Sequence, residues 1–201
     1  LRKSIHYLSF NLLNMFLTKN FHLENKFFLR GSKKFLNSNF QKLNRNYLTL
    51  SARYSVNLNS NIHSKIINRS ENNQASDLKK IILKIRENKL NKNKKIVIIT
   101  SEEGMKHYKK KINLKNINYS YEYTKNFLGH IELILNSEKY FSYGASGIVI
   151  FPLLASKSYL ISWRHEPNQE YRYSSDKYVG WQKRNQKTIF YCNLKTYLSY
   201  I

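Results

Sequence analysis

Short apolar runs rich in β-branched and aromatic residues recur through the middle of the chain, and each predicts a β-strand. The clearest is residues 95–100, which read Lys-Ile-Val-Ile-Ile-Thr without alternation between apolar and polar positions. A continuous apolar run of this length is typical of a strand covered on both faces, as in a parallel sheet. The predicted strands are residues 47–53, 95–100, 117–123, 139–142 and 158–162.

Amphipathic segments separate these runs and predict helices. Residues 78–85 place four apolar side chains at helical spacing, after an expected N-cap at Ser76 and Asp77. Further helices are predicted at residues 103–110, 130–136 and 148–155. Strands and helices that alternate with short connections indicate an α/β fold: a doubly wound, mostly parallel, Rossmann-like sheet with helices on both faces.

This pattern divides the chain into three blocks. Residues 1–46 hold an N-terminal helix and a basic connection, residues 47–162 the α/β unit, and residues 163–201 an aromatic and basic tail with one helix packing on the unit. The first helix has two interpretations, because a helix without acidic residues suits either core packing or a targeting and membrane-surface role. The chain begins with Leu1, so we also expect a processed chain or a fragment that lacks most of an N-terminal domain.

The charge of the chain has two explanations. A formal net charge of +23 favours an anionic partner such as nucleic acid or a membrane surface. Lys, Asn, Ile and Tyr are abundant throughout, however, and an A/T-rich genome would impose this composition whatever the protein binds. The single cysteine suits a reducing compartment, and the longest apolar run, residues 147–155, is far shorter than the roughly 20 residues that span a bilayer. We therefore expect a cytoplasmic protein that associates with membranes only peripherally, if it does so.

Polar and glycine residues follow three of the predicted strands. In open α/β sheets, ligands bind beyond the carboxyl ends of the strands, where helix N-termini present N–H groups to anions. The first strand is followed by Arg53 and a polar loop at 54–74, which we expect to be mobile or ordered by a ligand. The loop 142–147, Ser-Tyr-Gly-Ala-Ser-Gly, allows close approach of a phosphate, although its glycines could serve only to turn the chain. It matches neither the Walker loop nor the GxGxxG pattern.

Residues 128–147 resemble a known family. The segment Leu-Gly-His-Ile-Glu-Leu-Ile-Leu-Asn-Ser at 128–137, then Tyr-Phe-Ser at 140–142 and Gly-Ala-Ser-Gly at 144–147, is similar to the C-terminal donor-binding domain of two-Rossmann (GT-B-like), fucosyltransferase-like glycosyltransferases. In that family the turn and helix cradle the diphosphate of a nucleotide-sugar, and a His-x-Arg signature supplies an arginine to the phosphates. Here Ser51-Ala52-Arg53 matches the arginine and not the histidine. The resemblance implies a nucleotide-sugar donor and a glycan acceptor.

The residues themselves suggest how such a site would work. Only Asp77 and Asp176 are aspartates, and they are far apart, so a metal held by an Asp-x-Asp pair is excluded. The negative charge of the departing diphosphate must then be stabilised by cations and N–H dipoles. Arg53 is the candidate residue for binding the phosphates, and the alternative is that it forms a surface salt bridge. Glu102 and His130 are catalytic candidates, and each could instead be a helix-terminal or exposed group. The predicted donor-binding residues are Ser51, Arg53, Ser101, Glu132, Ser142, Tyr143, Gly144, Ala145, Ser146 and Gly147.

Two functions from different classes remain open at this point. The first is a metal-independent glycosyltransferase, or its donor-binding part, that uses a nucleotide-sugar as co-substrate without a cofactor and acts on a cell-surface glycan. The second is a noncatalytic basic RNA-binding protein, such as an organellar ribosomal component, which the charge favours. The six histidines form no paired spacing and the Gly-x-Ser-x-Gly pattern is absent, which argues against a zinc site and a hydrolase.

Overall fold

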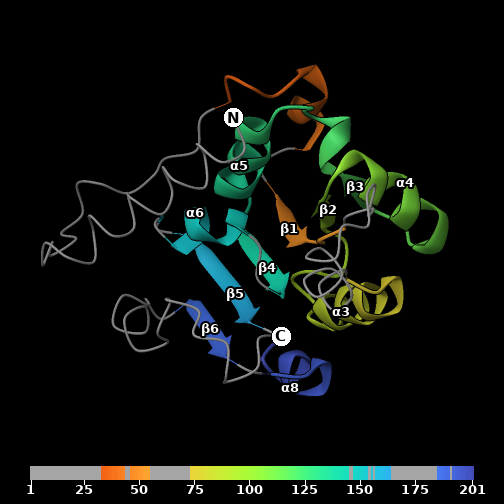
Figure 1. Ribbon diagram of the computed structural model, residues 1–201, viewed down its shortest axis with the longest axis vertical. Helices are drawn as coiled ribbons and strands as arrows, with labels where there is room; N and C mark the ends of the chain where they lie inside the picture. The colour runs from red at the N-terminus through yellow and green to blue at the C-terminus, as the bar shows by residue number, and fades with distance from the viewer. Residues whose placement is uncertain are drawn as a thin grey trace, which may run out of the picture.

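A six-stranded, all-parallel β-sheet forms the centre of the computed structural model, with strand order β3-β2-β1-β4-β5-β6 (Figure 1). The structure describes residues 33–43, 46–54, 73–144, 147–153, 155, 157–163, 185–190 and 192–201. The strands are β1 (Tyr47–Ser51), β2 (Lys95–Ile99), β3 (Ile117–Tyr119), β4 (Lys139–Tyr143), β5 (Ser158–Trp163) and β6 (Gln186–Phe190). The predicted α/β, Rossmann-like fold is confirmed.

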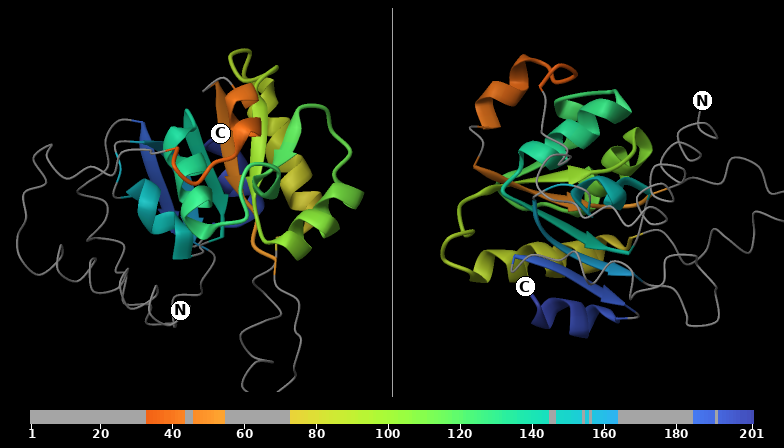
Figure 2. Two further views of the ribbon diagram at one scale, coloured as in Figure 1. Left: turned by 90° about the horizontal axis from the view of Figure 1, so that it is seen from above. Right: turned by 90° about the vertical axis from the view of Figure 1, so that its left-hand side faces the viewer.

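Helices cover both faces of the sheet, as the right-hand view of Figure 2 shows. One face, here called the α3 face, packs against α3 (Ala75–Glu87), α4 (Glu102–Lys111) and α8 (Leu194–Ser199). The opposite α5 face packs against η1 (Ser38–Leu43), α5 (Phe127–Asn136), η3 (Gly147–Val149) and α6 (Ile150–Leu153).

Successive side chains along each strand point to opposite faces of the sheet and so contribute alternately to the two cores. In β1, Leu48 and Leu50 belong to the core on the α3 face, while Tyr47 belongs to the core on the α5 face. Both sets are buried because the strand has a neighbour on each side and helices above and below. This arrangement explains why the run at 95–100 shows no polar alternation.

Several predicted boundaries are wrong, each for a local reason. Helix α3 begins at Ala75 after Gln74, so Ser76 and Asp77 lie in its first turn and do not cap it. Strand β3 ends at Tyr119, because Ser120 starts the 3-10 helix η2 (Ser120–Glu122) and its hydroxyl lies 3.3 Å from both the N and the O of Thr100. The predicted helix at 148–155 divides into η3 and α6.

The sheet continues beyond residue 162, where the sequence predicted a tail with one helix packing on the unit and no further strand. Strand β6 pairs in parallel with β5, from Tyr159 opposite Gln186 to Trp163 opposite Phe190. Helix α8 then returns over the α3 face, and the buried Tyr197 donates from its hydroxyl to the carbonyl oxygen of Leu160 at 3.2 Å. The C-terminal segment is therefore part of the α/β unit. The predicted helix within residues 1–23 and most of the aromatic tail lie outside the described residues.

No helix within the described ranges combines the length and the apolar character needed to cross a bilayer.

Candidate ligand site at the carboxyl edge of the sheet

The strand order places the switch point of the sheet, here called the crevice, between the carboxyl ends of β1 and β4. After β1 the chain continues to α3 on one face, and after β4 it continues to η3 and α6 on the other. Connections that leave neighbouring strands toward opposite faces open a gap at the switch point, which is where open α/β sheets bind ligands. Arg53 follows β1 and Gly144 follows β4, so the structure brings these two predicted site residues to the two sides of one crevice.

Asn73 joins the two sides of the crevice. Its Oδ1 accepts from Arg53 N at 2.7 Å, and its Nδ2 donates to the carbonyl oxygen of Tyr143, also at 2.7 Å. Its backbone N–H donates to the carbonyl oxygen of Arg53 at 2.9 Å. Asn73 is buried, so these hydrogen bonds are shielded from water and fix the backbone of Arg53 relative to the end of β4.

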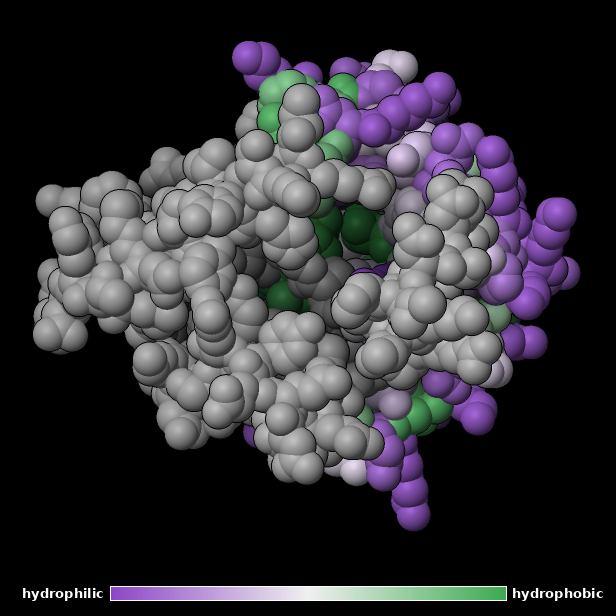
Figure 3. All heavy atoms as spheres, in the orientation of Figure 1, coloured by the Kyte–Doolittle hydropathy of each residue, from purple (hydrophilic) through white to green (hydrophobic). Residues whose placement is uncertain are grey.

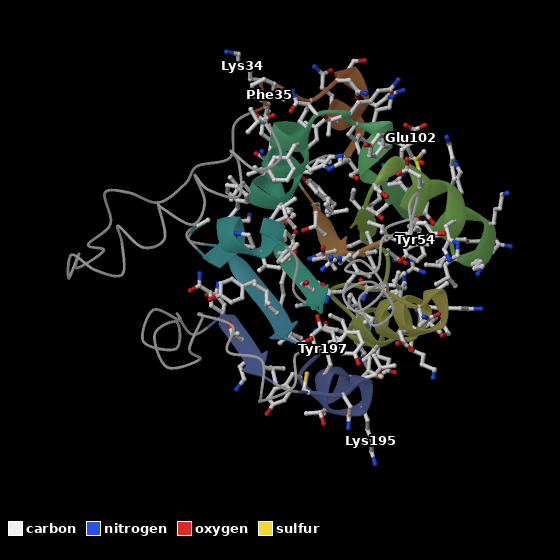
Figure 4. All side chains as sticks on the ribbon, viewed as in Figure 1. Lys34, Phe35, Tyr54, Glu102, Lys195 and Tyr197 are labelled. Carbon is white, nitrogen blue, oxygen red and sulfur yellow. The ribbon has the colours of Figure 1, made fainter. Side chains whose placement is uncertain are left out.

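Helix α4 supports the same strand end from the α3 face. The Oη of the buried Tyr108 lies 2.9 Å from the carbonyl oxygen of Arg53 and 2.8 Å from that of Asn73. Tyr54 stacks on His107 with ring centroids 4.4 Å apart, and Figure 4 shows it beside α4. The residues that follow β1 thus pack against aromatic side chains of α4.

Ser101 has a structural role at the start of α4. Its Oγ accepts from Gly104 N at 3.1 Å, which caps the helix, and donates to the carbonyl oxygen of Tyr54 at 3.2 Å. The sequence predicted Ser101 as a donor-binding residue. The one proton of the hydroxyl is already donated within the protein and is not free for a phosphate oxygen.

The glycine turn after β4 is also held by internal hydrogen bonds. Gly144 has a φ of 96°, a conformation that L side chains rarely adopt. Its N–H points at Ser162, 3.2 Å from the carbonyl oxygen and 3.3 Å from Oγ, and its own carbonyl accepts from Ser142 Oγ at 2.8 Å. Gly147 starts η3, while Ala145 and Ser146 lie outside the described residues. The N–H of Gly144 is therefore committed to Ser162 and not directed at a ligand.

Small buried side chains lie at the carboxyl ends of β1 and β4 on the α5 face. Ser51 and Ser142 are paired across β1 and β4, and both are buried. Tyr140 lies two residues before Ser142 on the same face of β4, and burial raises its pKa to about 12, so it remains a neutral phenol.

The predicted site residues Glu102, Glu132 and His130 lie in different surroundings. Glu102, at the start of α4, is exposed and pairs with Lys106 at 2.9 Å, and this hydrogen bond and charge lower its pKa. Glu132 is buried on α5, and its Oε2 accepts from Phe35 N at 2.9 Å; Figure 4 shows Phe35 next to this helix. A carboxylate with a lowered pKa is a weaker base, so the environment of Glu102 does not favour it as a general base.

His130 is buried in the first turns of α5. Its ring lies against Tyr121 in an edge-on arrangement, with centroids 5.3 Å apart. Burial lowers its pKa to about 4, and a hydrogen bond to the backbone of Thr124 opposes part of that shift. The imidazole is therefore neutral at pH 7, which removes charge attraction as a means of binding phosphate.

The sequence missed the residues that organise the crevice. Asn73 lay within a long polar loop and Tyr108 within a short amphipathic helix, and neither position differs in pattern from its neighbours. Their partners are distant in the sequence, with Asn73 bonding across 70 residues and Tyr108 across 55. Only the prediction of a Rossmann-like strand order could have placed residue 73 near β4.

Within the ranges that the structure describes, no group of three or more His, Cys, Asp or Glu side chains could hold a metal ion. Comparisons with protein-family models, with curated proteins and with solved structures gave no match.

Proposed function

We propose that this chain binds a nucleotide-sugar in the crevice between β1 and β4 and is a metal-independent glycosyltransferase or its donor-binding part. The observation that carries the proposal is the link through Asn73, which holds Arg53 and the end of β4 on opposite sides of the switch point. An arginine whose backbone is held at the carboxyl edge of a parallel sheet is suited to the diphosphate of a nucleotide. The resemblance of residues 128–147 to donor-binding domains supports a nucleotide-sugar as the ligand.

The chemistry asked of the site is stabilisation of the departing nucleoside diphosphate. Arg53 is partly exposed, and its guanidinium can make two parallel hydrogen bonds to phosphate oxygens. Fixed cations and dipoles at the position where charge develops are the usual means of lowering such a barrier without a metal.

Calorimetric titration with UDP-glucose and GDP-mannose in the presence of EDTA tests this function. We expect one of these probes to bind wild-type protein, Arg53→Ala to weaken that binding at least tenfold, and Arg53→Lys to recover part of the loss. Lys79→Ala, which removes an exposed cation from α3, is the matched control and should bind as wild type. Full affinity in Arg53→Ala would exclude Arg53 from the site. If neither probe bound the wild-type protein, the proposal would be contradicted.

RNA binding is the second candidate, and the exposed lysines of α3 and α4 favour it. Lys79 and Lys80 are exposed on α3, and Lys109, Lys110 and Lys111 on α4. Figure 3 shows that hydrophilic side chains gather on the side of the molecule where these helices lie. Contacts between lysines and RNA phosphates give an affinity that falls steeply as the salt concentration rises. Titration with a single-stranded RNA oligonucleotide tests this function. Binding that is tighter than that of the nucleotide-sugars and that weakens strongly between 50 and 200 mM NaCl would favour it.

A further inference from the structure

The starts of the parallel strands carry an exposed basic surface, at the opposite edge of the sheet from the crevice. Its most prominent part is the loop that joins α3 to β2, which the right-hand view of Figure 2 shows beyond the amino ends of the strands. Lys89 and Lys92 are exposed in this loop, as are Lys115 in the connection between α4 and β3 and Lys42 in η1. These four lysines and Leu90 are here called the amino-edge surface.

Leu90 is presented to solvent by an ordered turn. Its N–H donates to Asn88 Oδ1 at 3.0 Å, and Asn91 N donates to the carbonyl oxygen of Asn88 at 2.9 Å. Lys94 N then donates to the carbonyl oxygen of Asn91 at 3.1 Å. The side chain of Leu90 is nevertheless 79% exposed, more than any other large apolar side chain that the structure describes. A fixed turn thus holds an aliphatic group outward at this edge of the sheet.

Hydrogen bonds between elements bring the lysines around this turn. Asn116 Nδ2 donates to the carbonyl oxygen of Asn93 at 3.4 Å, which joins the connection that carries Lys115 to the loop. Lys95, the first residue of β2, donates from Nζ to the carbonyl oxygen of Lys42 at 2.9 Å. The lysines therefore come from segments that are separate in the sequence and neighbouring in the fold.

The amino-edge surface has an excess of positive charge. In the connections that lead into β2, β3, β4 and β5 the sequence contains one carboxylate, Glu138, and this group pairs with Lys94. None of the four exposed lysines forms an ion pair within the part of the chain that the structure describes. Exposed cations of this kind attract anionic partners.

An exposed leucine among exposed lysines fits the interface of an anionic bilayer. Lysines near such a surface are attracted to lipid phosphates, while a neighbouring apolar side chain enters the boundary between headgroups and acyl chains. RNA phosphates would account for the lysines but would leave Leu90 without a role, because bases stack on aromatic rings and not on leucine. The combination therefore favours a lipid surface as the partner.

We propose that the amino-edge surface binds membranes that contain anionic phospholipids. The four lysines contact headgroup phosphates, and Leu90 inserts at the boundary with the acyl chains. One leucine and a few lysines give weak, reversible attachment that is lost at high salt. The crevice lies at the carboxyl edge of the sheet and would face away from the bilayer, so this inference is independent of the proposed nucleotide-sugar function.

Co-sedimentation with vesicles tests the proposal. The probes are vesicles of phosphatidylcholine alone and vesicles that also contain about 30% phosphatidylserine. We expect wild-type protein to bind the second kind and not the first. Leu90→Ser should bind about tenfold more weakly, because it loses most of the gain from burying a leucine. Lys89→Gln with Lys92→Gln should bind about 25-fold more weakly, from about fivefold for each lysine.

Matched controls come from the opposite edge of the sheet. Leu128→Ser removes an exposed leucine at the start of α5, and Lys79→Gln with Lys80→Gln removes two exposed lysines near the start of α3. Both control variants should bind vesicles as wild type does. All of the substituted side chains are exposed, so every variant should keep the stability of wild type in urea.

Three results would overturn the proposal: no binding of wild type to the anionic vesicles at low salt, equal binding by wild type and Leu90→Ser, or equal losses in the amino-edge and control variants. Amino-edge substitutions that weaken binding of a single-stranded RNA and leave vesicle binding unchanged would assign the surface to RNA instead. Nucleotide-sugar affinity should be the same in Leu90→Ser as in wild type. Vesicle binding should likewise be unchanged in Arg53→Ala, so the two proposals can fail separately.

Discussion

The side-chain amide of Asn73 donates to the carbonyl oxygen of Tyr143 at 2.7 Å, a hydrogen bond across 70 residues that joins the two sides of the candidate crevice. The same side chain accepts from Arg53 N, so a single buried amide satisfies one polar group from each of two strand ends. Parallel strands diverge at their carboxyl ends once the ladder of backbone hydrogen bonds stops. Asn73 extends the connection between β1 and β4 beyond that point.

Replacing Asn73 tests this connection. In Asn73→Ala, Arg53 N and the carbonyl oxygen of Tyr143 both lose a buried partner, so we expect the free energy of unfolding to fall by about 2–4 kcal/mol. Urea denaturation measures the change. Asn113→Ala, at an exposed loop position, is the control and should stay within about 0.5 kcal/mol of wild type. A similar value for the two variants would show that Asn73 does not hold the strand ends together.

The strands with two neighbours were predictable because burial on both faces leaves a clear pattern in the sequence. Residues 95–100 gave β2 almost to the residue, since every side chain from Ile96 to Ile99 is buried. Strand β6 was missed because it lies at the edge of the sheet, where Lys187 is exposed and polar residues interrupt the apolar pattern. An edge strand has one partner, so less of its sequence is dictated by burial.

The positions of two predicted site residues in the fold were predictable from the sequence, and the hydrogen bonds of the others were not. The rule that ligands bind at carboxyl strand ends led to Arg53 and Gly144, which do follow the ends of the neighbouring strands β1 and β4. It could not tell that the hydroxyls of Ser101 and Ser142 form hydrogen bonds with backbone groups of the protein. Serine caps and turns use the same residue type as phosphate-binding loops, and only the geometry distinguishes them.

Gly104 of α4 lies so close to the end of β2 that a larger residue does not fit. A Cβ at this position would overlap Thr100 Oγ1 and come within 3.0 Å of Tyr54 Cβ. Alanine normally stabilises a helix relative to glycine, but here we expect Gly104→Ala to lower the free energy of unfolding by about 1–3 kcal/mol. Thermal and urea unfolding measure this change.

Two further variants isolate the cause. Ser76→Ala, at an exposed position of α3, reports the effect of helix propensity alone and should be close to neutral. The double variant Gly104→Ala with Thr100→Ala removes the overlapping oxygen and should recover part of the loss, as coupled neighbours do. Strict additivity of the two substitutions would argue against the contact as the cause.

The carboxylate of Glu132 anchors the segment before η1, and this role can be separated from ligand binding. Glu132→Ala leaves Phe35 N without its acceptor, and we expect it to cost about 1–3 kcal/mol of stability, with a smaller loss in Glu132→Gln. Affinity for a nucleotide-sugar should be unchanged in Glu132→Gln. Glu103→Ala, which removes an exposed carboxylate from α4, controls for the loss of charge. Weaker nucleotide-sugar binding in Glu132→Gln with unchanged stability would instead support the donor-contacting role predicted from the sequence.

The buried imidazole of His130 should make stability depend on pH in a defined window. Its pKa is lowered from 6.5 to about 4 by burial, so between these values the unfolded chain binds a proton that the folded protein does not. Stability therefore rises with pH: the contribution is fully present above about pH 6.5 and is lost as the pH falls toward 4, by up to about 3 kcal/mol. Urea denaturation of wild type and His130→Phe across pH 4 to 8 measures the difference, and subtracting the two curves removes the carboxylates that titrate nearby. The difference should be steepest between pH 4.5 and 6. Parallel curves would show that the imidazole titrates normally in the folded protein and is accessible to water.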